Sequence, residues 1–293
     1  MNMLMEMNQE IVGIKEASGV LQAPASKSFT QRALACALLA EGESIIVNAS
    51  QCDDAVAALN IIQALGARVE KNEGNLIIQG GFSPTAEKLN CGESGFNIRF
   101  FTPIAGLSSS PLTLHGTGSL LKRPIGDLSA LKHFGCSVET NGFPPVTIRG
   151  PLNGGCVEID ASLSSQFLSG LLTALPLAQS DSTVVVRALN SKPYVQMTLE
   201  VVKKFGIEIQ AREDLTEFHI PGNQKYAACE YTVEGDYSSA AFWMVAAAIN
   251  GSVTLSGLKE KSLQADAVVV DLLRQAGAIV RQTNDSVSVE SSG

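Results

Sequence analysis

Aromatic and charged residues are scarce in this sequence of 293 residues. Aromatic side chains make up 5% of it and charged ones 17%, whereas 45% of the residues are hydrophobic. A chain of this length and composition forms one large domain or two smaller ones, with a sizeable buried core. The net charge is −8, and no run is rich in Lys and Arg. We therefore expect no general surface for nucleic acid or for an anionic membrane.

Histidine is almost absent, and cysteine does not occur in metal-binding pairs. The 3 histidines are isolated, and the 6 cysteines are scattered without a Cys-x-x-Cys pair. We therefore expect neither a metal-ligand set nor a Ser-His-Asp triad. The cysteines are typical of reduced structural thiols in a cytoplasmic protein, so we expect a cytoplasmic location.

Long apolar segments are also missing. The longest, residues 240–249, is far too short to span a bilayer. Residues 1–16 lack the basic region and apolar core of a signal peptide. The sequence thus predicts neither membrane insertion nor secretion.

What the sequence does contain is an internal repeat of roughly 70 residues. An amphipathic helix that ends at a glycine, followed by two short strands, occurs four times. The helices are predicted over 53–66, 125–135, 195–206 and 265–277, and the strand pairs at 67–70 and 75–78, 136–139 and 145–148, 207–209 and 217–220, and 278–280 and 286–289. A terminal glycine relieves the left-handed backbone that commonly ends a helix.

A second kind of helix precedes each amphipathic one and is apolar nearly all round, which predicts burial on every side. These helices begin near Ser26, Gly92, Ser164 and Tyr237, and each is followed by an apolar or β-branched strand. With a leading strand such as 19–22, the unit is βαβαββ. Its buried helices must lie inside, with sheets outside.

The repeats also predict the domain organisation. Three of them, over residues 21–234, form one complete domain. Residues 1–20 and 235–293 form part of a second domain, which leaves some apolar faces uncovered. The fold class is therefore α/β (α+β), with one complete domain of three repeats and an incomplete one.

Residues 24–32 predict an anion site at the start of the first buried helix. Ser26 and Ser28 are favourable N-cap residues, and a helix start offers free N–H groups and partial positive charge. Lys27 and Arg32 add two cations, which together suit a phosphate. For this segment alone, an ordinary capped helix with two solvated cations is the alternative.

Similar residues recur at the same point of the later repeats. Ser164 and Ser165 begin the third buried helix, and Arg123-Pro124 and 191–194 precede amphipathic helices. Arg99 stands as far into its helix as Arg32. Each of these residues, considered alone, is explained as a helix cap or a surface cation. Because they recur at the same point of the repeat, they predict that several helix N-termini converge on one face.

Six short motifs stand in order along nearly the whole chain. They are Pro-Ala-Ser-Lys-Ser-x-x-x-Arg-Ala (24–33), Gly-x-Ser-Gly-x-x-x-Arg (92–99), Lys-Arg-Pro-Ile-Gly (122–126), Ser-Ser-Gln-Phe-Leu (164–168), Ser-Lys-Pro-Tyr (191–194) and Glu-Gly-Asp-x-Ser-Ser-Ala (234–240). Together they resemble the EPSP synthase (3-phosphoshikimate 1-carboxyvinyltransferase) family. The resemblance implies an inverse α/β-prism of six βαβαββ units in two domains, of which this chain resembles the first two-thirds.

The resemblance also implies the site. Lys27 is the catalytic residue that it assigns here, in contact with both substrates, while the family's general base lies outside these 293 residues. The implied ligands of shikimate 3-phosphate are Lys27, Ser28, Arg32, Ser164, Ser165, Gln166, Ser191 and Tyr194. The implied ligands of phosphoenolpyruvate are Lys27, Gly95, Arg123 and Gln166.

The implied reaction transfers an enolpyruvyl group to the 5-hydroxyl of shikimate 3-phosphate through a non-covalent tetrahedral adduct. It needs no metal and no cofactor, because fixed cations and N–H donors stabilise the charge that grows at the phosphate and carboxylate. We expect a monomer that binds these two anions. We also expect that residues 1–293 alone turn over poorly.

Three departures from the family pattern stand out. Ala25 replaces a common Gly, Glu93 a usual Asn and Phe96 a usual Thr. Glu93 is expected either to weaken phosphoenolpyruvate binding or to pair with Arg99.

Two other functions remain as alternatives. UDP-N-acetylglucosamine enolpyruvyl transferase shares the fold, but it normally has Asn where Ser28 stands and a cysteine within the loop that corresponds to 116–122. A non-catalytic fragment that binds shikimate 3-phosphate is the other alternative.

Overall fold

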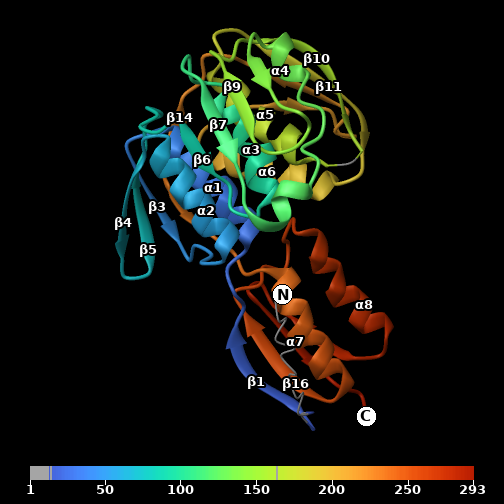
Figure 1. The fold of residues 1–293 in the computed structure, drawn as a ribbon. Helices are drawn as coiled ribbons and strands as arrows, with labels where there is room; N and C mark the ends of the chain where they lie inside the picture. The colour runs from blue at the N-terminus through green and yellow to red at the C-terminus, as the bar shows by residue number, and fades with distance from the viewer. Residues whose placement is uncertain (1–12, 14, 163) are drawn as a thin grey trace, which may run out of the picture. The chain divides into compact units, whose positions relative to one another are not determined.

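The computed structural model describes residues 13, 15–162 and 164–293, and the chain divides into two compact units (Figure 1). The described part of unit 1 comprises residues 13, 15–23, 237–262 and 266–293, and unit 2 comprises residues 24–236 and 263–265. Each unit has its own hydrophobic core. The predicted mixed α/β class is confirmed.

Unit 2 consists of three βαβαββ repeats. The first contains α1 (Lys27–Leu39), β3 (Glu43–Val47), α2 (Asp53–Ala64), β4 (Arg68–Asn72) and β5 (Asn75–Gln79). The second contains β6 (Lys88–Asn90), α3 (Gly95–Ala105), β7 (Leu112–His115), 3₁₀ helix η1 (Gly118–Lys122), α4 (Ala130–His133), β8 (Ser137–Glu139) and β9 (Val146–Arg149). The third contains β10 (Gly155–Ala161), α5 (Gln166–Ala174), η2 (Leu175–Leu177), β11 (Ser182–Leu189), α6 (Lys192–Lys204), β12 (Gln210–Ala211) and β13 (Glu217–Ile220).

The three repeats form three sheets of the same topology. Their strand orders are β15-β3-β5-β4, β6-β7-β9-β8 and β10-β11-β13-β12, in each of which the first pair is parallel and the others antiparallel. The first sheet takes its leading strand, β15 (Glu230–Thr232), from the end of the unit. A short parallel pair is formed by the strands that precede β3 and β15 in sequence, β2 (Ala40–Glu41) and β14 (Tyr226–Ala227). The last strands of unit 2 therefore pair with its first ones.

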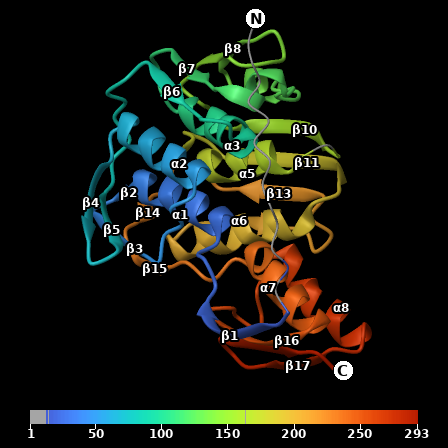
Figure 2. The same ribbon diagram turned by 60° about the horizontal axis from the view of Figure 1, so that its bottom comes forward.

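Helices α1, α3 and α5 are enclosed by these sheets, as Figure 2 shows for unit 2. Every residue of α1 from Phe29 to Leu39 is buried, and so are most residues of α3 and α5. Small residues allow the close approach, because a Cβ added to Gly170 of α5 would overlap the carbonyl oxygen of Phe100 in α3. The predicted burial of these three helices on all sides is confirmed.

Unit 1 has a single sheet, β1-β16-β18-β17, formed by β1 (Ala17–Gln22), β16 (Gly251–Ser256), β17 (Ile279–Gln282) and β18 (Ser286–Glu290). Helix α7 (Tyr237–Ile249), most of η3 (Ala265–Val268) and α8 (Val269–Gln275) complete it. The predicted burial of α7 on every side is wrong. Tyr237 and Met244 are buried, but Phe242 is 80% exposed and Ile249 78%. One sheet covers one face of a helix, and within the described residues the opposite face has no cover.

The leading strand predicted for the first repeat was also wrong. Residues 19–22 lie in β1, which pairs in parallel with β16 of unit 1, and β15 supplies the leading strand of the first repeat. Leu21 and Ala23 pack on the core of unit 1, which explains the pairing.

Two other predicted elements differ. The helix expected over 125–135 is only Ala130–His133, because the carbonyls of Pro124 and Ile125 accept hydrogen bonds from Arg99. The strand expected at 207–209 begins at Gln210. There the side-chain amide of Gln224 bonds both the N–H and the carbonyl of Glu208, which replaces a strand partner.

Candidate active site

The first helix start carries a lysine that is held by a carboxylate. Lys27 is the first residue of α1, and its Nζ lies 3.1 Å from Oδ2 of Asp54 in α2. The Lys27 side chain is 46% exposed and that of Asp54 27%, so the amine keeps access to solvent. Ser26 stands at the N-cap, where its carbonyl, rather than its side chain, accepts from the Thr30 N–H. The pair with Asp54 fixes the direction of the lysine.

Arg32, one turn further along α1, is buried, and each of its three side-chain nitrogens donates a hydrogen bond. Its Nε donates to Thr198 Oγ1 over 2.8 Å, and Nη2 donates to the carbonyl of Tyr194 over 3.1 Å. Nη1 bonds the Ser28 carbonyl, and the guanidinium carbon lies 4.8 Å from the centre of the Phe96 ring. Burial lowers the pKa of Arg32 to about 10. In this arrangement Arg32 ties α1 to α6.

The start of α3 is bordered by two guanidinium groups. Ser94 caps the helix by accepting from the Asn97 N–H over 3.3 Å. A Cβ added to Gly95 would lie 2.8 Å from Nη1 of Arg99 and 3.9 Å from Nη1 of Arg123. Burial, and secondarily the charge of Arg123, lowers the pKa of Arg99. Glycine at position 95 therefore lets the Arg99 guanidinium lie against the helix start.

A set of hydrogen bonds, here named the polar cycle, links α1 to α3, α3 to α5, α5 to α6 and α6 back to α1. Gln31 of α1 donates to Asn97 of α3 over 2.7 Å, and Arg99 of α3 donates to Gln166 Oε1 of α5 over 2.8 Å. Ser169 of α5 and Thr198 of α6 share a bond of 3.0 Å, and Arg32 of α1 closes the cycle through Thr198. These bonds hold the helix starts in register with one another.

The predicted serines stand at helix starts. Ser164 Oγ accepts from the Gln166 N–H over 3.1 Å, and Ser165 is buried at the N-cap of α5. Ser191 is the N-cap of α6, and its carbonyl accepts from the Tyr194 N–H over 3.2 Å. No side-chain cap bond is formed by Ser165 or Ser191. Their role as ligands stays a prediction.

The expected pairing of Glu93 with Arg99 is wrong. Glu93 Oε2 accepts from the Ser119 N–H over 2.8 Å. Arg99 instead donates to the carbonyls of Gly95, Pro124 and Ile125 and to Gln166. These neutral acceptors satisfy the guanidinium and leave the carboxylate free to hold Ser119.

Sequence reasoning missed four members of the polar cycle. Gln31, Asn97, Ser169 and Thr198 are all buried polar residues. A polar side chain one or two turns into an otherwise apolar, buried helix must find a partner. That signal is present in the sequence and identifies such residues, although it does not identify their partners.

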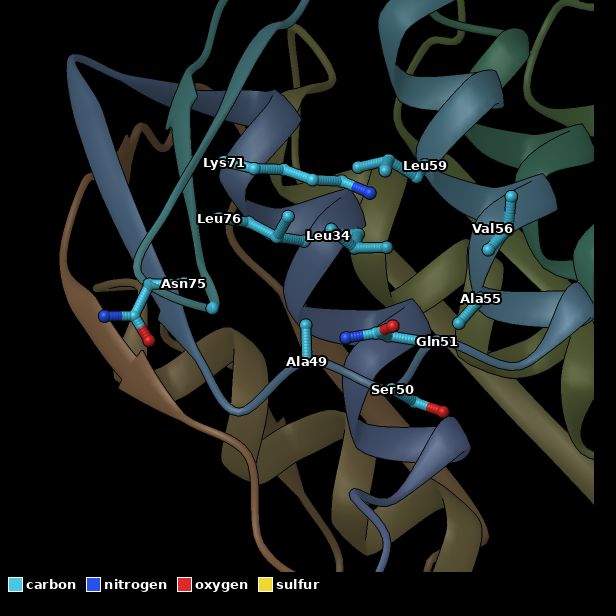
Figure 3. A pocket seen from close by; sticks show the side chains of 11 residues that line it. Leu34, Ala49, Ser50, Gln51, Ala55, Val56, Leu59, Lys71, Asn75 and Leu76 are labelled. Carbon is cyan, nitrogen blue, oxygen red and sulfur yellow. The ribbon is translucent and has the colours of Figure 1, made fainter.

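A pocket of about 160 Å³ is lined by residues of α1, of α2 and of the turn that joins β4 to β5 (Figure 3). Leu34, Leu59 and Leu76 line it, and the Lys71 side chain extends across it toward Leu59. None of the site residues predicted above lines this pocket. Ser50, which also lines it, donates its N–H to Thr30 Oγ1 of α1 over 3.0 Å.

Among the described residues, no helix has the length and apolar character needed to span a membrane. No group of three or more His, Cys, Asp or Glu side chains in that part of the chain is placed to hold a metal ion.

Comparison with known proteins agrees with the resemblance of the motifs. A family model described as EPSP synthase (3-phosphoshikimate 1-carboxyvinyltransferase) matches residues 11–293. The 3-phosphoshikimate 1-carboxyvinyltransferase of Methanocorpusculum labreanum is 39% identical over 286 residues, which cover 95% of this chain and 67% of that protein. The protein of that name from Methanosphaera stadtmanae is 35% identical over 302 residues, which cover 98% and 71%.

A solved structure of EPSP synthase from Acinetobacter baumannii matches with a TM-score of 0.79 at 25% identity. The match covers 96% of this chain and 66% of that one. The chain therefore spans about two thirds of the length of the relatives that it matches.

Proposed function

Because the chain belongs to the EPSP synthase family, we propose that it takes part in enolpyruvyl transfer from phosphoenolpyruvate to the 5-hydroxyl of shikimate 3-phosphate. One observation carries the proposal. The polar cycle holds the starts of α1, α3 and α5 together, with Gly95 and two guanidinium groups at one of them. Several helix N-termini with fixed cations suit two small polyanions.

Each helix start has a role in this proposal. The start of α3 at Gly95, with Arg123, binds the phosphate of phosphoenolpyruvate. Ser164 and Ser165 at α5, with Ser191 at α6, bind the phosphate and ring hydroxyls of shikimate 3-phosphate. Gln166 contacts both substrates.

The residues of α1 complete the proposed site. Lys27, which Asp54 directs and which remains solvent-accessible, contacts both substrates. Ser28 and Arg32 face the shikimate carboxylate, and Tyr194 packs by the ring. Arg32 makes its present bonds to carbonyl and hydroxyl oxygens, so a carboxylate would exchange with neutral acceptors.

The proposed chemistry is addition followed by elimination. The 5-hydroxyl loses its proton and adds to C2 of phosphoenolpyruvate while C3 takes up a proton. C3 of the tetrahedral adduct then loses a proton as phosphate leaves, and the enol ether forms. Fixed cations and backbone N–H groups stabilise the charge that grows on the phosphate and the carboxylate. The family's general base is not among the six matched motifs, so residues 1–293 assayed alone should bind the substrates without normal turnover.

Calorimetry and a phosphate-release assay on residues 1–293 test this proposal. Binding of shikimate 3-phosphate supports it, and binding without release identifies a non-catalytic form. Binding of a UDP-amino sugar instead would favour the sister transferase, against which Ser28 and the absence of cysteine from 116–122 argue. Binding of neither ligand would refute the proposal.

Lys27→Ala should weaken the binding of shikimate 3-phosphate about ten- to a hundredfold, because a charge-assisted hydrogen bond is lost. The matched control is Lys225→Ala. It removes another lysine whose Nζ lies 3.1 Å from a carboxylate, that of Glu41. Such surface pairs contribute about 1 kcal/mol or less to stability, so both variants should fold. Equal affinities of the two variants for shikimate 3-phosphate would show that Lys27 does not bind this substrate.

A further inference from the structure

The segment that carries Arg123 is fastened to the start of α3. The Cys91 N–H donates to the His115 carbonyl and the Thr117 N–H to the Gly92 carbonyl, each over 2.8 Å. Leu120, in the middle of η1, is 1% exposed and anchors the segment in the core. Within the described residues, Glu93 is the only one of residues 91–95 whose side chain forms a hydrogen bond with η1.

Glu93 and Gly118 fit one another. The backbone of Gly118 has a φ of +53°, and a Cβ there would overlap the Glu93 carboxylate. The carboxylate thus occupies the space above the first turn of η1, where its Oε2 accepts the Ser119 N–H over 2.8 Å. An N–H at the start of a helical turn is one that the turn itself leaves without a partner, and a carboxylate is a favourable acceptor for it.

A second bond leads from η1 to the cation. Arg123 Nη2 donates to Ser119 Oγ over 3.2 Å, so Glu93, Ser119 and Arg123 form a chain of contacts. Hydrogen bonds from the backbone and hydroxyl of Ser119, and then the charge of Arg123, lower the pKa of Glu93. The carboxylate is therefore ionised at neutral pH.

We propose that Glu93 is a positioning residue: its carboxylate holds η1 so that Arg123 faces the helix start at Gly95, where an anion binds. The identity of that anion as phosphoenolpyruvate rests on the proposed function. The same negative charge also lowers the attraction of Arg123 for an anion. The hydrogen bond that Glu93 accepts therefore raises the affinity for the anion, whereas the charge of Glu93 lowers it.

Two substitutions separate the acceptor from the charge. Glu93→Gln keeps an oxygen that accepts the Ser119 N–H but removes the charge, whereas Glu93→Ala removes both. Calorimetry with phosphoenolpyruvate should give about tenfold weaker binding for Glu93→Ala, because Arg123 loses its fixed direction. Glu93→Gln should bind as tightly as the natural chain or more tightly. Glu139→Ala removes an exposed carboxylate of β8 and serves as the control.

Amide hydrogen exchange at Ser119 supplies a readout that is independent of any ligand. The Ser119 N–H should exchange at least tenfold faster in Glu93→Ala and at the natural rate in Glu93→Gln. If both Glu93 variants bind phosphoenolpyruvate more tightly, Glu93 is only an opposing charge and the inference is wrong. Unchanged exchange and affinity in Glu93→Ala overturn it as well. If the natural chain binds no phosphoenolpyruvate, the proposed function fails, while the Ser119 exchange still decides whether Glu93 holds η1.

Discussion

Arg32 is 2% exposed, and the three hydrogen bonds of its guanidinium go to neutral oxygen atoms. A buried cation is costly unless every N–H finds an acceptor and the geometry is rigid. Arginine meets this need with its planar fork, whereas a lysine ammonium presents a single centre. Arg32 is therefore a structural link between α1 and α6, whatever it also binds.

Arg32→Lys should lower the free energy of unfolding by about 2–4 kcal/mol, because at least two buried acceptors lose their donors. The matched control is Arg149→Lys, since Arg149 also donates to a carbonyl, that of Ser109, but on the surface. The control should change stability by about 0.5 kcal/mol or less. Urea denaturation followed by circular dichroism measures both variants, and equal midpoints would show that Arg32 is not a structural link.

The buried thiols predict a loss of stability at high pH. Burial raises the pKa of Cys36 and of Cys91 well above the ordinary thiol range. In the unfolded chain both thiols ionise near pH 9, while in the folded chain they stay protonated. Their contribution is thus complete below that pH and is lost as the pH rises further, by about 1 kcal/mol for each thiol at pH 10.

Urea midpoints at pH 7.5 and pH 10 measure this loss. The comparison of the natural chain with a Cys36→Ala, Cys91→Ala double variant isolates the thiols from lysine and tyrosine. The urea midpoint of the double variant should fall less between pH 7.5 and pH 10 than that of the natural chain. Identical falls in the midpoint would mean that the two thiols ionise equally in the folded and unfolded states.

Which contacts the sequence could predict depends on their range. Motif residues such as Lys27, Gly95 and Ser165 could be assigned to helix starts because capping is local. The partner of Glu93 could not be predicted, since Ser119 is brought to it by a turn with a left-handed glycine at position 118. The pairing of Lys27 with Asp54 likewise depends on how two helices pack.

Helices α3 and α5 approach one another closely at Gly170. A methyl group at Gly170 would overlap the carbonyl oxygen of Phe100, so the two helices cannot keep their separation with a larger residue there. This contact also fixes Arg99 relative to Gln166 in the polar cycle. Packing deep in the unit therefore determines the geometry at its site.

Gly170→Ala should lower the free energy of unfolding by about 1–3 kcal/mol through overpacking. Gly155→Ala is the control, because a Cβ there would meet its nearest neighbour at an ordinary 3.5 Å. Thermal unfolding of both variants measures the difference. A Gly170→Ala variant as stable as the control would contradict the close packing of α3 on α5.

At the level of elements, the 70-residue period predicted most helices and strands of unit 2, because each is encoded by its own apolar pattern. The exceptions have non-local causes. Arg99 uses the carbonyls where a longer α4 was expected, and Gln224 bonds Glu208 where a strand was expected. Side chains that compete for backbone groups from a distance leave no periodic signal.

At the scale of the molecule, the described residues form two separate cores, and that of unit 1 is much smaller. A smaller core supplies less stabilisation, so unit 1 should unfold first. The single tryptophan, Trp243, lies in α7 of unit 1 and reports on that unit alone. Its fluorescence should therefore change at a lower urea concentration than the main change in far-ultraviolet circular dichroism.

Trp243→Phe provides the control, because it should abolish the fluorescence signal and leave the main circular dichroism transition in place. Coincident transitions for both probes would show that the two units unfold as one cooperative body.

Strand β15 has a consequence for biosynthesis. Because β3 receives its parallel partner only from Glu230–Thr232, a ribosome must translate as far as residue 232 before the first sheet is complete. Until then Ile45, Ile46 and Val47 form an open edge on a nascent polypeptide, the kind of edge that other chains can join. Production of this protein should therefore respond to chaperones that shield emerging strands, and more so when translation pauses between Val47 and Thr232.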